Sequence, residues 1–128
     1  MVIDTSAILA IALNEPEAAL FEQHITNDPV RLISAATVLE ISIVLETRMS
    51  EEAVREFDLW LQKAEVEIVN VDTVQLEAAR HAWRRFGKGR HPAGLNYGDC
   101  FSYALAFTRQ ETLLLKGNDF SKTDIVSV

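Results

Sequence analysis

Four carboxylates occupy positions in this sequence that surface acids do not usually take. Asp4 follows a short apolar run at the start of the chain, and Asp119 follows the apolar run 112–115 in the same way. Glu40 and Asp99 lie within apolar helical patterns, where a side chain that faces the core needs a partner for its charge. Two acids beyond strand ends and two on buried helices would converge on one acidic pocket.

Such a pocket has a limited chemistry. Like charges about 4 Å apart repel by about 4 kcal/mol at an effective dielectric near 20, so the carboxylates must take up protons or bind cations. Oxygen ligands, with a single cysteine and no histidine pair at ligand spacing, favour Mg²⁺ or Mn²⁺ over zinc. Because Mg²⁺ usually acts with phosphate oxygens, we expect phosphodiester chemistry, in which water activated by the metal or by a spare carboxylate attacks phosphorus in line.

Each acid taken alone also has a structural explanation. Asp4 would cap a helix, Asp99 would favour the positive end of its helix, and Asp119 would form an Asx turn. A salt bridge or a borderline exposed position would account for Glu40. Asp124 is a fifth candidate that is more typical of a turn or cap, which leaves the choice of a fourth acid open between Asp119 and Asp124.

Short apolar strands alternate with helices along the chain. Strands are expected at 2–3, 30–33, 66–71 and 112–115, with a fifth allowed at 125–126. Helices are expected at 7–13, at 16–26 with Pro16 in the first turn, at 36–48 after Ser34, and at 98–109. One further helix begins at 51 after its N-cap Ser50, and another begins after its cap Asp72 and stops at Gly87. Helix 36–48 should be largely buried, with Glu46 about 120° around it from Glu40. This order predicts an α/β fold of four to five short, mainly parallel strands flanked by helices, with the site outside the carboxyl ends of the strands.

Length and composition fit one folded domain over 1–128. The 128 residues are 48% hydrophobic and 24% charged, which excludes disorder and fibrous repeats. No apolar run approaches the ~20 residues of a membrane span, and no secretory signal opens the chain, so we expect a cytoplasmic protein without membrane contact. Cys100 is the only cysteine, which rules out an internal disulfide and a thiolate-rich zinc site.

The charge is unevenly distributed. The formal net charge is −7, yet five of the twelve Lys and Arg residues fall between 78 and 98, a stretch without any acid. A solvated helix face with a basic end would explain this, but such a stretch would also hold a phosphate backbone locally. The candidate RNA contacts in it are Arg84, Arg85, Lys88, Arg90 and His91.

Four blocks of the sequence, in order, closely resemble the PIN-domain ribonucleases, and among them the VapC-type toxins of type II toxin–antitoxin pairs. The blocks are Met1-Val2-Ile3-Asp4-Thr5-Ser6-Ala7, Ser34-Ala35-Ala36-Thr37-Val38-Leu39-Glu40, the stretch 86–100 that ends in Leu95-Asn96-Tyr97-Gly98-Asp99-Cys100, and Leu115-Lys116-Gly117-Asn118-Asp119-Phe120. The resemblance covers nearly the whole chain.

The resemblance implies a fold, an activity and partners. It implies a three-layer α/β/α PIN-like fold and cleavage of RNA that depends on Mg²⁺ or Mn²⁺. Asp4, Glu40 and Asp99 would be the principal catalytic and metal-binding acids, with Asp119 as the fourth. Thr5, Ser6 and Asn118 would orient carboxylates or water. It further implies a homodimer and inhibition by a VapB-type antitoxin, whose C-terminal segment reaches the acidic site within a toxin–antitoxin hetero-oligomer.

Other functions compete with this interpretation. Another metal-dependent nuclease or phosphodiesterase, acting on DNA or flap structures, would use the same acids. A receiver domain needs an adjacent acid pair after its first strand, and a haloacid-dehalogenase-type phosphatase needs Asp-x-Asp, whereas Thr5-Ser6 follows Asp4 here. A non-catalytic PIN-like binding module should have lost its carboxylates first, and this chain retains all four.

Overall fold

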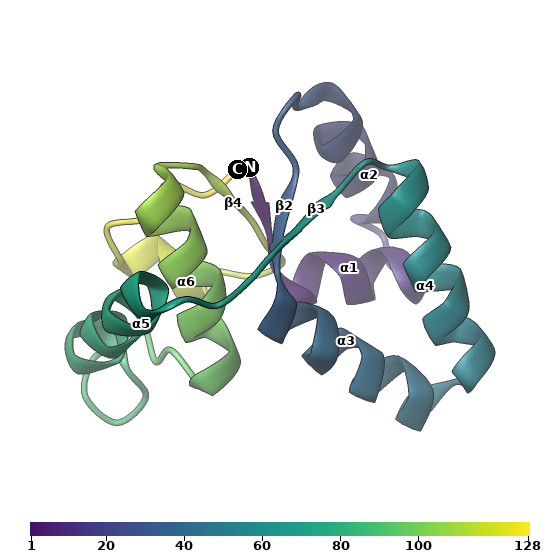
Figure 1. Ribbon diagram of the computed structural model, residues 1–128. Coiled ribbons are helices and arrows are strands. Elements are labelled where there is room, and N and C mark those ends of the chain that lie inside the picture. The colour runs from purple at the N-terminus through teal and green to yellow at the C-terminus, as the bar shows by residue number, and fades with distance from the viewer.

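The computed structural model describes the backbone of residues 1–128 and every side chain except that of Asp119. The elements in chain order are β1 (Val2–Ile3), α1 (Thr5–Ala12), α2 (Ala18–Asn27), β2 (Leu32–Ser34), α3 (Ala35–Arg48), α4 (Glu51–Lys63), β3 (Glu67–Val69), α5 (Thr73–Phe86), α6 (Tyr97–Arg109), β4 (Leu113–Leu114) and the 3₁₀ helix η1 (Asp119–Lys122). The sheet runs through the middle of the molecule, and the two chain ends lie close together (Figure 1).

The four strands form one parallel sheet in the order β3-β2-β1-β4. Val2 pairs with Leu32 on one side and with Leu113 on the other, so β1 is central. The carboxyl ends of β1 and β4 therefore lie side by side, which brings the segments that follow them to one edge of the sheet.

Side chains alternate between two cores across the sheet, as the pleat of a strand requires. Ile3, Ile33 and Leu114 join a core with α1 to α4, whereas Val2 and Leu113 join a core with α5 and α6. Figure 1 shows these two groups of helices on opposite sides of the strands. The predicted three-layer α/β/α architecture with a parallel sheet is thus confirmed.

Polar side chains cap the helix starts. Asp4, Ser34, Ser50 and Asp72 each accept a hydrogen bond from a backbone N–H of the first turn of α1, α3, α4 and α5, at the predicted positions. Asn96 does the same for α6, which begins one residue earlier than predicted. These caps explain why the helix boundaries were predictable from the sequence.

Three predictions about the elements were wrong. The fifth strand is reduced to a single bridge between Leu113 and Ser127. Pro16 lies in a turn before α2 and not in the first turn of that helix. Helix α3 is not largely buried, because Leu39 and Ile43 are 62% and 55% exposed.

None of the helices in the described chain is long and apolar enough to cross a membrane.

Candidate active site

Three acids that are distant in the sequence line one pocket at the carboxyl end of the sheet. Asp4 lies directly after β1, Glu40 comes from α3, and Asp99 comes from the first turn of α6. The pocket has a volume of about 240 Å³, and Lys116, which follows β4, lies at its edge. The fold thus places the three acids around one cavity, as the sequence predicts for a metal pocket.

Asp4 is held from three directions. Its Oδ2 accepts hydrogen bonds from the Ser6 N–H at 3.0 Å and the Ser6 hydroxyl at 2.7 Å. Its Oδ1 accepts one from the Ser102 hydroxyl at 2.6 Å. The residue is only 6% exposed, so these donors compensate for the lost hydration of a buried charge. Asp4 therefore caps α1 and also faces the pocket.

Glu40 is half-buried on the inward face of α3. Its Oε1 accepts a hydrogen bond from the Thr5 hydroxyl, which links α3 to the start of α1. A Cβ at position 98 would overlap the Glu40 carboxylate, so Gly98 lets α6 approach this side chain closely. Glu46, on the same helix, is exposed and lies outside the pocket.

Asp99 forms a capping box with Asn96. The Asn96 N–H donates to Asp99 Oδ2, and the Asp99 N–H donates to Asn96 Oδ1, both at 2.9 Å. The positive end of the α6 dipole favours the charge of Asp99 there. The structural explanation for Asp99 and its place in the pocket are therefore compatible.

Lys116 is a residue of the site that the sequence analysis missed. Its ammonium group donates to Glu15 and lies 3.5 Å from Glu17 Oε2, which ties the pocket edge to the turn between α1 and α2. The hydrogen bond with Glu15 raises the pKa of Lys116. Its backbone N–H donates to the Ser6 hydroxyl at 2.9 Å, so the segment after β4 is fastened to the residue that holds Asp4. Its place after the fourth strand was the available signal.

The donor chemistry of the pocket fits a hard divalent cation. Carboxylate and hydroxyl oxygens line it, and Cys100 is turned away, with its thiol donating to the Asn96 carbonyl. Among the described side chains, no group of three acids, histidines or cysteines is close enough together to hold a metal ion by itself. This arrangement suits Mg²⁺ or Mn²⁺, because Mg²⁺ keeps several of its waters and is usually held by one or two carboxylates.

The remaining acids and polar residues after β4 are placed differently. The side chain of Asp119 lies outside the part of the chain that the structure describes. Asn118 is exposed and does not line the pocket. Asp124 is away from it, where it accepts a hydrogen bond from the Tyr103 hydroxyl at 2.7 Å and pairs with Arg85 at 3.0 Å. Asp124 is therefore a structural residue of the C-terminal segment.

The basic stretch is largely engaged in contacts within the chain. Arg85 pairs with Asp124, and the Arg90 guanidinium lies 4.1 Å from the centre of the Trp83 ring. His91 braces its loop, since its Nδ1 accepts a hydrogen bond from the Ala93 N–H at 3.0 Å. Arg84 and Lys88 are exposed, and Arg84 lines a wide groove between α5 and α6. These two are the better candidates for contacts with a polyanion.

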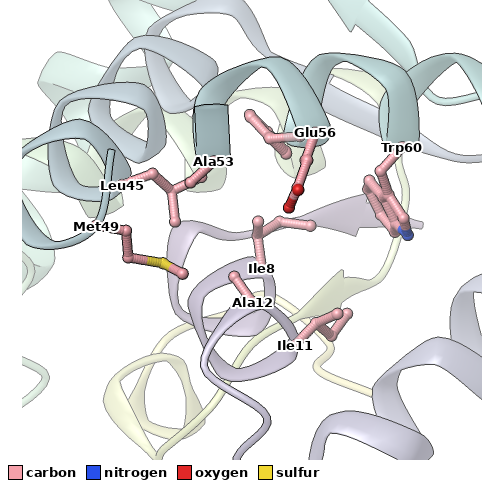
Figure 2. Close-up of a pocket in the computed structure, with 9 residues that line it drawn as sticks. Ile8, Ile11, Ala12, Leu45, Met49, Ala53, Glu56 and Trp60 are labelled. Carbon is pink, nitrogen blue, oxygen red and sulfur yellow. The ribbon is translucent and has the colours of Figure 1, made fainter. Parts of the chain in front are cut away.

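A second, apolar groove lies on the other side of α1. Figure 2 shows it between α1, the end of α3 and α4, where Ile8, Met49 and Trp60 line it. The carboxylate of Glu56 points into this groove. Helix α1 connects the two sites, because Ile8 lines the groove and Leu9 lines the acid pocket.

The chain is similar to known proteins over its whole length. A family model described as "PIN domain" matches residues 1–126. The chain is 56% identical to "Ribonuclease VapC" of Mycolicibacterium smegmatis, over all of this chain and 99% of that protein. It is 53% identical to "Ribonuclease VapC30" of Mycobacterium tuberculosis, over all of this chain and 98% of that protein.

Solved structures share the fold at lower sequence identity. VapC20 of Mycobacterium tuberculosis, described as a sarcin-ricin loop cleaving toxin, superposes with a TM-score of 0.80 at 18% identity, over 99% of this chain and 97% of that one. A toxin–antitoxin complex from Klebsiella pneumoniae gives 0.73 at 18% identity, over 99% and 95%. Together with the family model and the relatives that are more than half identical, the pocket and the fold show that the chain belongs to the PIN-domain family, among the VapC ribonucleases.

Proposed function

We propose that this chain, as one PIN domain over 1–128, is an endoribonuclease that hydrolyses RNA in the acid pocket and acts as the toxin of a VapBC-type pair in the cytoplasm. The single observation that supports this most is the meeting of Asp4, Glu40 and Asp99 around one cavity at the carboxyl end of the sheet. PIN-domain ribonucleases in general depend on divalent metal ions.

We assign the residues of the pocket as follows. Asp4, Glu40 and Asp99 would hold Mg²⁺ or Mn²⁺, directly or through the waters that Mg²⁺ keeps, with Asp119 as the fourth acid. The ion supplies Lewis-acid chemistry, activating water and stabilising negative charge on the phosphate. Ser6 and Thr5 hold the Asp4 and Glu40 carboxylates in fixed orientations, as their hydrogen bonds indicate.

The exposed cationic side chains would contact the rest of the RNA. Arg84 and Lys88 carry charge that the substrate backbone would neutralise. Because the chain is acidic overall, with a net charge of −7, binding depends on this local positive region, and we expect it to weaken with added salt.

The partners are a VapB-type antitoxin and a second copy of the chain. Structures similar in fold include a toxin–antitoxin complex from Klebsiella pneumoniae and a DNA-bound VapBC from Salmonella typhimurium. We place the antitoxin segment in the groove of Figure 2, because α1 leads from that groove directly into the acid pocket. An inhibitor on this path would cover the acids and exclude RNA.

The proposal is tested by RNA cleavage with the purified chain. Asp4→Asn and Asp99→Asn should abolish cleavage in excess Mg²⁺ or Mn²⁺ while the fold is retained or stabilised, since each removes a repelling charge. Glu40→Gln should do the same, whereas Glu46→Gln, an equal change at an exposed position of the same helix, should leave the rate unchanged.

The competing functions predict other results. Cleavage of single-stranded or flap DNA with RNA left intact would favour a different metal-dependent nuclease. RNA binding without cleavage under any divalent ion would favour a non-catalytic module. Undiminished cleavage by both Asp4→Asn and Asp99→Asn would contradict the assignment of the site.

A further inference from the structure

We propose that Ser102 is a positioning residue of the metal pocket, whose hydroxyl fixes the Asp4 carboxylate and fastens α6, the helix that carries Asp99, to the end of β1. This inference rests on the proposed function, in that Asp4 and Asp99 are taken as metal-binding acids. No motif in the sequence points to Ser102, which lies in an apolar run of the helix.

The contact between Ser102 and Asp4 is short and buried. The Ser102 hydroxyl donates to Asp4 Oδ1 at 2.6 Å, across 98 positions of sequence. Ser102 is 1% exposed, so its hydroxyl cannot exchange this bond for one to water unless the helix moves. A hydroxyl that donates to a carboxylate in such surroundings forms one of the stronger hydrogen bonds of a protein.

Three other helical hydroxyls of this chain, beyond the first turn of their helices, bond back to their own helix. The Ser42 hydroxyl donates to the Val38 carbonyl at 2.7 Å, and the Thr108 hydroxyl donates to the Ala104 carbonyl at 2.8 Å. Bonding back to the carbonyl four residues earlier is the local option for such side chains. Ser102 instead reaches across the fold to an acid of the pocket, which indicates a role beyond satisfying its own hydroxyl.

The bond completes the hold on Asp4. Ser6 donates to Oδ2, and Ser102 donates to Oδ1, so rotation of the carboxylate would break a bond at either oxygen. Oδ2 already accepts two of these bonds, whereas Oδ1 accepts only the one from Ser102 and keeps a lone pair for a further ligand, because a carboxylate oxygen has two lone pairs. Ser102 follows Asp99 by three residues and so lies on the same face of α6. The position of one metal-binding acid is thereby tied to that of the other.

The test measures Mn²⁺ binding to the metal-free chain by electron paramagnetic resonance, which needs no RNA. Ser102→Ala should weaken Mn²⁺ binding by about tenfold or more, the usual effect of losing a group that orients a metal ligand. Thr108→Val removes a hydroxyl from the same helix away from the acids and should leave the affinity unchanged. Ser102→Cys, which keeps a weak donor, should fall between Ser102→Ala and the parent.

A double-mutant cycle separates positioning from general damage to the fold. In an Asp4→Asn background, Ser102→Ala should change Mn²⁺ affinity by less than about twofold, because its effect passes through Asp4. Equal losses in both backgrounds would overturn the inference, as would parental Mn²⁺ affinity in folded Ser102→Ala. If Ser102→Ala does not fold, Ser102→Cys takes its place in the same cycle.

The two proposals fail in different ways. If the chain does not cleave RNA but Ser102→Ala still weakens Mn²⁺ binding through Asp4, the proposed function is contradicted and the role of Ser102 is supported. If the chain cleaves RNA in an Asp4-dependent way while folded Ser102→Ala binds Mn²⁺ as the parent does, the role of Ser102 is overturned and the function stands.

Discussion

Two acids of the pocket both cap a helix and line the cavity. Asp4 caps α1 and Asp99 closes the capping box of α6, while both line the cavity. The sequence could predict these acids because each interrupts a local apolar pattern. It could not predict Ser102, because a serine among small apolar residues carries no signal until folding brings it to Asp4. The fourth acid, Asp119, stays a prediction.

A substitution of Gly98 tests whether catalysis depends on the position of the Glu40 carboxylate. A Cβ at this position would overlap the Glu40 carboxylate, and the flexible end of that side chain is what would move. Gly98→Ala should therefore reduce kcat for RNA cleavage by about a hundredfold, the cost of misplacing a catalytic group by about 1 Å. Because alanine favours a helix over glycine, thermal stability should be unchanged or slightly higher. Parental activity in this variant would show that the position of Glu40 does not limit the reaction.

The residues at which the helices begin and end were easier to predict from the sequence than the contacts that the helices make with the rest of the fold. Asp72 starts α5 and Gly87 ends it as predicted, but Gly87 has φ −66°, so it is not a left-handed cap. Glycine is required at position 87 because a Cβ there would collide with the Trp83 carbonyl and ring. The basic stretch around it was predicted to be a solvated helix face or to hold phosphate, whereas Arg85 of α5 and Arg90 of the following loop are engaged by Asp124 and Trp83. Such pairings depend on segments that only the fold brings together.

The C-terminal segment is held to α5 and α6 through Asp124, which gives a pH-dependent prediction. Burial raises the pKa of Asp124, but the hydrogen bond from Tyr103 and the Arg85 charge lower it more, so the folded value lies below the ordinary 3.8. A depressed pKa means that the carboxylate stabilises the fold above its unfolded pKa and loses this effect as pH falls through the folded value. Asp124→Asn should therefore lower Tm most above about pH 5 and progressively less below about pH 4. Circular dichroism melts at several pH values test this, and a constant Tm difference down to pH 2 would contradict it.

The molecule as a whole exposes an apolar face next to its acid pocket. Leu39 and Ile43 of α3 flank a groove that Tyr97 and Phe101 of α6 also line, and the same two aromatic side chains line the adjoining groove against α5. Tyr97 is 81% exposed. Glu40 lines the first groove as well as the acid pocket, so the face and the site are continuous. From sequence alone, the apolar side chains of α3 indicated burial in the core, because a core and an interface have the same pattern.

We expect a second copy of the chain to cover this face, because exposed apolar side chains that gather on neighbouring helices are typical of protein–protein contacts. Leu39→Glu should turn a dimer into a monomer in sedimentation velocity, since an unpaired charge at an interface is costly, while the melting of the single chain changes little at an already exposed position. Leu59→Glu makes the same change at a leucine 54% exposed on α4 and should leave the dimer intact. A parent chain that sediments as a monomer at micromolar concentrations would contradict this assignment. Dissociation of both variants alike would mean that the added charge, and not the position of Leu39, controls assembly.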